Sequence, residues 1–156
     1  MKAYPIPNGG IHIEMDDNDD WRLIAHLIAD ARDETYDLAD DISANITAGD
    51  DLAADWADFV LPDLREQFDF ALARVAQTVG QAHAAHNGGP GRVVILQNAA
   101  PDWYGVLNRA RLALEHRHRF STLETISTKD LATHGARLRD RLYCALQSLL
   151  LDHSFE

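Results

Sequence analysis

The sequence predicts a mainly α-helical fold, a compact bundle of four to five helices with two short β-strands that can pair with each other. Three observations support this prediction. Apolar residues recur at three- and four-residue steps over most of the chain. Only two short segments have the character of strands, and turns rich in Gly and Pro separate the elements. The 156 residues contain no internal repeat, so we expect a single helical domain over residues 1–156.

The first predicted strand covers about residues 10–15, where β-branched residues alternate with polar ones. The nine residues before it are rich in Pro and Gly, and we expect them to be irregular. Four aspartates lie among residues 16–20, directly after the strand. They fit the N-terminal cap of a helix, because carboxylates are favourable at the positive end of the helix dipole. A calcium loop is the weaker interpretation, because the cluster has no Gly at its turn.

One long helix is predicted from Trp21 to Ile46, with an apolar stripe on one face and acidic residues on the others. A second helical stretch runs from Asp51 to Phe59, and Leu61-Pro62 should break or redirect it. Pro62 suits the first turn of a third helix, which continues to a firm stop at residues 87–91.

The second predicted strand covers about residues 92–97, and a helix follows from Ala99 to about Arg119. After a loop, a leucine-rich stripe predicts a last helix that should be the best buried in the fold. This helix contains Cys144, the only cysteine of the chain, which therefore cannot form an intramolecular disulfide. Its apolar neighbours predict a buried structural thiol.

The chain is strongly acidic, with 25 Asp and Glu against 14 Lys and Arg and a formal net charge of −11. Such a charge repels phosphate backbones and anionic membrane surfaces, so neither nucleic acid nor a membrane is an expected partner. We find neither the apolar run of a signal peptide nor a stretch long and apolar enough to span a bilayer. The expected location is therefore the cytoplasm.

A metal site is the first chemical hypothesis, because the chain has eight histidines. His83 and His86 are three residues apart on one predicted helix face and could share an ion. A zinc site needs at least a third ligand, which the fold would have to supply from elsewhere in the chain (candidates His26, Glu66 and Asp69). The alternative is that both histidines lie at a solvated helix end. No nucleophile or phosphate-binding motif is present, so we expect no cofactor and lean against an enzyme.

The densest group of polar residues lies on the helix after the second strand. Asn108 and Arg111 are three residues apart, so both can face one neighbour, such as a carboxylate or the backbone of a partner. Further arginines could form a positive surface for an acidic partner (Arg109, Arg117 and Arg119, with Arg137, Arg139 and Arg141 as further candidates). The sequence leaves a second interpretation open, in which these groups pair internally with acids of the first helix.

Residues 103–114 have the pattern W-x-x-x-L-N-x-x-R-L-x-L. This segment resembles an uncharacterised bacterial family, the domain of unknown function 2017. The order of elements is also similar, from an N-terminal strand and a leucine-rich helix to a closing leucine-rich helix. The resemblance implies no catalytic residues. Genes of the family often lie beside the substrate adaptor of the Clp protease, which implies a role in protein turnover.

Together these observations predict a non-enzymatic protein-interaction or regulatory module, possible partners being another protein or a second copy. The expected partner-binding residues are Trp103, Asn108, Arg109, Arg111, Arg117 and Arg119. Two alternatives remain open at this stage. One is a metal-binding protein or metal-dependent hydrolase that uses His83 and His86, and the other is a homo-oligomeric structural protein.

Overall fold

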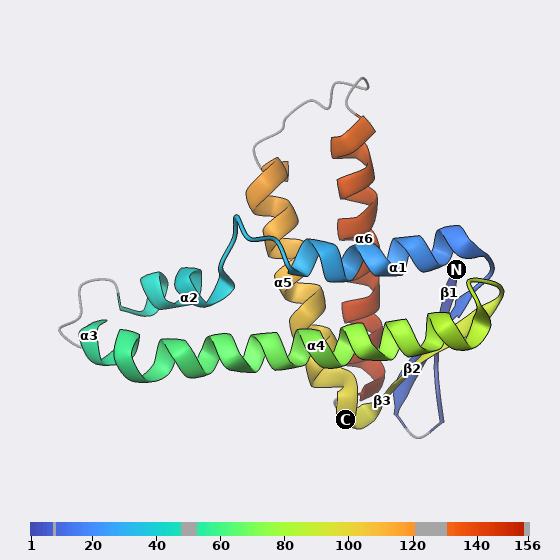
Figure 1. Ribbon diagram of the computed structural model, residues 1–156, viewed down its shortest axis with the longest axis horizontal. Helices are drawn as coiled ribbons and strands as arrows, with labels where there is room; N and C mark the ends of the chain where they lie inside the picture. The colour runs from blue at the N-terminus through green and yellow to red at the C-terminus, as the bar shows by residue number, and fades with distance from the viewer. Residues whose placement is uncertain (8, 48–52, 121–130, 155–156) are drawn as a thin grey trace.

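The computed structural model describes residues 1–7, 9–47, 53–120 and 131–154, and it is mainly α-helical with one small antiparallel sheet, as predicted (Figure 1). In chain order the elements are β1 (Lys2–Pro5), β2 (Gly10–Met15), α1 (Asn18–Ala31), α2 (Leu38–Ile46), α3 (Ala53–Asp55), a π-helical turn (Trp56–Val60), α4 (Leu61–His86), β3 (Gly91–Leu96), a 3₁₀ turn (Gln97–Ala99), α5 (Ala100–His118) and α6 (Leu131–Ser154).

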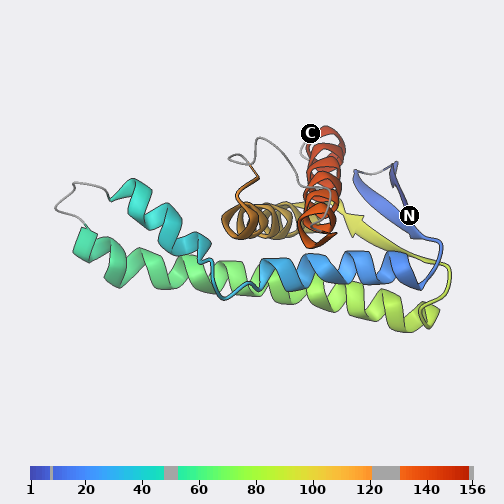
Figure 2. The same cartoon turned by 90° about the horizontal axis from the view of Figure 1, so that it is seen from above.

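The helices form two layers that cross each other. In Figure 1, α1 and α4 lie side by side along the long axis, and α5 and α6 run across them. Figure 2 shows that α5 and α6 cover one side of the α1–α4 layer and that the sheet lies at one end. At the other end, α2 and the first half of α4 project beyond α5 and α6. We call this projection, residues 38–46 and 53–70, the arm, and the rest of the molecule the body.

The sheet has the order β1-β2-β3, and both pairs of neighbours are antiparallel. The predicted pairing of the two strands is confirmed, since Gly10 pairs with Leu96 and Met15 with Gly91. The expectation of an irregular N-terminus is wrong for Lys2–Pro5, which form an edge strand on β2. Pro5 is tolerated there because it ends an edge strand, where a missing backbone N–H costs little.

The single long helix predicted from Trp21 to Ile46 is wrong, because the chain forms α1 and α2 with a break between them. At the break, the Asp33 carboxylate accepts hydrogen bonds from the backbone N–H and the hydroxyl of Thr35, at 2.9 and 2.7 Å. Asp37 then caps α2 by accepting from Ala39 and Asp40. These local hydrogen bonds compete with helix continuation.

The cap interpretation of the first acidic cluster agrees with the structure. Asp17 accepts hydrogen bonds from the backbone N–H groups of Asp19 and Asp20 and so begins α1. Asp16 and Asp20 form ion pairs with the N-terminal amino group. The cluster therefore fixes the start of α1 and holds the chain terminus against it.

The prediction that Pro62 lies in the first turn of a helix is confirmed, since α4 begins at Leu61, but the chain is not interrupted there because the helical run continues from Ala53 to His86. Pro62 has no N–H to donate, and its ring clashes with the regular α-helical path of the preceding turn. The π-helical turn just before it absorbs this conflict, and the Leu61 N–H donates to the carbonyl of Trp56, five residues earlier. The arm and the body consequently share one uninterrupted helical run.

The core is one contiguous cluster, and α5 lies at its centre with seven buried residues. The buried faces of β2 and β3 supply five more apolar side chains (Ile11, Ile13, Met15, Val93 and Ile95). The expectation that the last helix is best buried is wrong, because α6 leaves Leu131 and Leu138 exposed. Cys144 is exposed as well, which contradicts the predicted buried thiol. Within the described residues, every helix is too short or too polar to cross a membrane.

Candidate functional site

An open groove of about 590 Å³ runs between α1 and α4. Its apolar lining comes from Ala25, Ile28 and Ala29 of α1 and from Ala76, Val79 and Gly80 of α4. The small residues are spaced four apart on each helix, and a Cβ added at Gly80 would meet no atom within 4 Å. The groove is therefore open because its two helices carry little side-chain bulk where they face it.

Charges at the groove are of one sign. Arg22 and Arg32 line it, and none of the described lining residues is acidic. This is notable in a chain with 25 carboxylates and only 14 Lys and Arg. Arg22 contacts Asp19 in an exposed pair at 3.2 Å, and Arg32 forms no ion pair with any residue that the structure describes. The groove, which we call the α1–α4 groove, thus offers an apolar floor with two cations.

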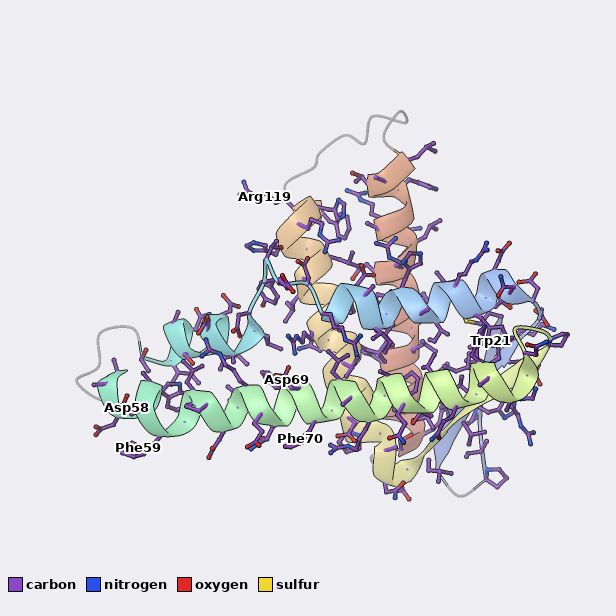
Figure 3. The ribbon with its side chains drawn as sticks, in the orientation of Figure 1. Trp21, Asp58, Phe59, Asp69, Phe70 and Arg119 are labelled. Carbon is purple, nitrogen blue, oxygen red and sulfur yellow. The ribbon has the colours of Figure 1, made fainter. Side chains whose placement is uncertain are left out.

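Trp21 closes the groove near the start of α1, next to the end of α4 (Figure 3). Its indole N–H donates to the carbonyl of Gly89 at 2.8 Å, which fixes the ring. His83 packs edge-on against this ring and His86 stacks on it, with ring centroids 5.4 and 6.2 Å away. The two histidines therefore contribute aromatic packing at the helix end.

The metal hypothesis has no ligand set in the described part of the chain. No group of three or more His, Cys, Asp or Glu residues there could hold a metal ion. Asp69, one candidate for a third ligand, instead contacts Arg109 at the junction of α4 and α5. His83 and His86 instead pack against the indole ring of Trp21.

The motif on α5 is largely a packing motif. Trp103 is only 1% exposed and belongs to the core, so it gives a partner no surface to bind. Asn108 is half-buried. Arg111 donates to Asp140 at 2.9 Å and to Gln147 at 2.8 Å, and both acceptors lie on α6. Arg111 therefore links α5 to α6. Its carboxylate partner, Asp140, lies on the last helix rather than on the first.

The family model described as domain of unknown function (DUF2017) matches residues 14–152. The chain belongs to this family. Comparison with curated proteins and with solved structures gives no match. In this DUF2017 chain, the matched region includes all three residues of the Arg111 contact and both walls of the α1–α4 groove.

The remaining predicted site residues are Arg109, Arg117 and Arg119, and the structure places them separately. Arg117 pairs with the buried Asp33 in the break between α1 and α2. Arg109 contacts Asp69 at 3.4 Å, while its Nε is buried without a partner in the described residues. Arg119 lies just past the end of α5 in a left-handed conformation, and Figure 3 shows it pointing outward. Pairing with an acid of the predicted first helix is thus found for Arg117, whereas the acid that Arg109 contacts lies on α4.

Sequence reasoning missed the main polar contact of the core. Asp30 of α1 is 4% exposed, and it accepts two hydrogen bonds from Arg139, at 2.7 and 3.2 Å. The hydroxyl of Tyr143 donates to the same carboxylate at 2.9 Å. Burial, followed by the charge and hydrogen bond of Asp30, raises the pKa of Tyr143 well above its ordinary value. The sequence did contain a signal for this contact, because Asp30 lies on the apolar side of α1.

The groove was missed as well, although a signal was present. Ala25 and Ala29, like Ala76 and Gly80, repeat at a spacing of four, which places small residues together on one helix face. A sequence does not reveal which helix lies opposite such a face. The structure brings the two small-residue faces together along the same groove.

Proposed function

We propose that this DUF2017 chain is a non-enzymatic protein-interaction module and that the α1–α4 groove receives a helix of its partner. The observation that supports the proposal is the lining of the groove, apolar along its floor and cationic at its edge. An amphipathic helix places its apolar face in such a groove, and the charged residues beside that face determine the register in which it binds. The two arginines favour a partner helix with acidic residues beside its apolar face.

The dimensions of the groove suit a short helix. Arg22 and Arg32 are ten residues apart on α1, which corresponds to about 15 Å, or about three turns of helix. Large apolar side chains of a partner would fill the space that the Ala and Gly residues leave open.

The proposal differs from the sequence-based expectation in the surface that it uses. Trp103, Arg111 and Arg117 make internal contacts, so the proposed surface moves from α5 to the groove between α1 and α4. The expected link to Clp-type protein turnover remains part of the proposal, on the family resemblance alone. It makes the Clp substrate adaptor the first purified protein to test.

A bulky substitution in the groove tests the proposal. Ala29→Trp should fill the groove, because Ala29 is exposed and lies in its lining. Ala145→Trp is the matched control, at an exposed position of α6 outside the groove. Both variants should keep the circular dichroism spectrum of the wild type, since neither residue is in the core.

The readout is the set of proteins retained by the full-length chain in affinity purification from its native cell, together with direct binding of the purified adaptor. We expect the wild type and Ala145→Trp to retain the same partner and Ala29→Trp to lose it. Equal retention by both Trp variants would show that the partner does not bind in the α1–α4 groove. The proposed binding site would then be wrong.

A further inference from the structure

The arm carries an exposed ridge whose chemistry complements the α1–α4 groove. Phe59, Asp63, Glu66 and Phe70 are spaced four, three and four residues apart, so they follow one face of the helical run. Phe59 is 72% exposed and Phe70 is 55% exposed. Figure 3 shows both on the same side of the helix, away from α2. We call these four residues the ridge.

The acids of the ridge are not matched by a cation of the described residues. Asp63 and Glu66 are exposed, and neither forms an ion pair with a residue that the structure describes. Arg65, between them in sequence, turns the other way and pairs with Asp37 and Asp40 of α2. Two large aromatic side chains and two unpaired carboxylates on one helix face form an unusual surface for a monomer.

The ridge and the groove match in length as well as in charge. Phe59 and Phe70 are eleven residues apart, about 16 Å of helix, and the two groove arginines are about 15 Å apart. With the ridge centred in the groove, each carboxylate would lie about 5 Å along the axis from an arginine, which is within reach of that long side chain. The aromatic rings would then meet the Ala and Gly floor.

A molecule cannot place its own ridge in its own groove. The ridge lies in the first half of the helical run and the groove wall in the second, and this run is continuous from Ala53 to His86. Building on the proposed function of the groove, we propose that its occupant is the ridge of a second copy of this chain. Because ridge and groove are different patches, the contact is heterologous, and each molecule offers one of each.

The formal net charge of −11 works against this contact at long range. Association therefore depends on local pairing of the ridge carboxylates with Arg22 and Arg32 and on burial of the two phenylalanines. A charge reversal on one side should weaken it, and a matching reversal on the other side should restore it. This dependence separates the specific contact from nonspecific aggregation.

The test is sedimentation velocity of the full chain over a wide concentration range. We expect the wild type to associate. A ridge variant (Phe59→Ser with Phe70→Ser) and a groove variant (Ala29→Trp) should each raise the dissociation constant by at least about tenfold. An equimolar mixture of the two should associate again and stop at a dimer, since one variant keeps the groove and the other keeps the ridge. Leu138→Ser, an exposed apolar residue of α6 outside both patches, is the control and should behave as the wild type.

A second pair of variants distinguishes loss of the ridge–groove contact from altered folding. Arg22→Glu with Arg32→Glu should abolish association, and mixing with Asp63→Arg plus Glu66→Arg should restore it. A wild type that stays monomeric at the highest concentration, or mixtures that stay monomeric, would overturn the inference. In that case capture of another protein that Ala29→Trp abolishes would still support the proposed function, whereas capture that Ala29→Trp leaves unchanged would refute it.

Discussion

The body and the arm hold their helices together in different ways. In the body, Trp103 of α5 is buried in the core, and the Asp30 carboxylate is buried with Arg139 and Tyr143. In the arm, Trp56 is half-buried and donates from its indole N–H to Ser43 at 2.9 Å, while Arg65 forms exposed ion pairs. The body therefore depends on apolar burial, and the arm is a two-helix projection that leaves Phe59 and Phe70 free for contact.

The arm and the body also differ in their charges. The arm contains seven of the 25 carboxylates and only one of the 14 Lys and Arg. The body holds most of the cations, including both arginines of the α1–α4 groove. A chain with such separated charges can bind a copy of itself in one orientation even though its net charge is repulsive.

The largest expected effect comes from removing one tryptophan from each region. Trp103→Ala should lower the free energy of unfolding by about 3–5 kcal/mol, because it leaves a large cavity in a close-packed core. Trp56→Ala should cost roughly 1 kcal/mol, since it removes one hydrogen bond and partial burial in the arm. Urea unfolding followed by circular dichroism measures both. Equal losses would show that the arm is part of the cooperative core.

The next effect concerns the charged contacts of the two regions. Asp30→Ala leaves the Arg139 guanidinium without its partner in a mostly buried position, and we expect a loss of about 3 kcal/mol. Arg65→Ala breaks ion pairs that are open to solvent, so the change should be near the detection limit of the same urea experiment. A large loss from Arg65→Ala would mean that the arm depends on its charges more than its exposure indicates.

The junction of arm and body should give the chain a pH dependence. Burial acts to raise the pKa of Asp33, but the hydrogen bonds from Thr35 and the ion pair with Arg117 outweigh it and lower that pKa below its ordinary value. A lowered pKa in the folded state means that the charged form stabilises the fold above about pH 4 and that this contribution is lost as the pH falls through the folded-state pKa.

Asp33→Asn should therefore be less stable than the wild type by about 1–2 kcal/mol at pH 7, because Asn keeps the shape but loses the charge. The gap should close as the pH falls through the lowered folded-state pKa of Asp33. Urea unfolding at a series of pH values measures it, with Glu34→Gln, an exposed neighbour, as the control. A gap that persists unchanged at low pH would assign the effect to packing rather than to charge.

Much of this fold could be predicted from local pattern. The strands at 10–15 and 92–97 and the helix after the second strand followed from alternation and helical periodicity, and their bounds agree closely with β2, β3 and α5. Asp17 caps α1 as the acidic cluster indicated. Each of these features depends on neighbours in sequence, which is where propensity and capping act.

The errors came where distant residues decide the outcome. On α6 the leucine stripe predicted the buried face. Three polar residues of α6 turn inward instead, because Asp30 and Arg111 form hydrogen bonds with them (Arg139, Tyr143 and Gln147). Leu131 and Cys144 are consequently exposed. The α1–α4 groove likewise requires knowing which helices are neighbours. Hydrophobic pattern alone places polar side chains outside and cannot foresee a partner many residues away.

The smallest expected effect links the stability of the body to its groove. Gly80 and Gly105 lie inside α4 and α5, and a Cβ added at either would meet no atom within 4 Å. Gly80→Ala and Gly105→Ala should each stabilise the fold by about 0.5–1 kcal/mol, because Ala loses less backbone entropy in a helix. Only Gly80→Ala places its methyl group in the groove, so only this variant should also weaken self-association in sedimentation velocity. Equal effects of the two variants on association would mean that the groove floor does not contact the ridge.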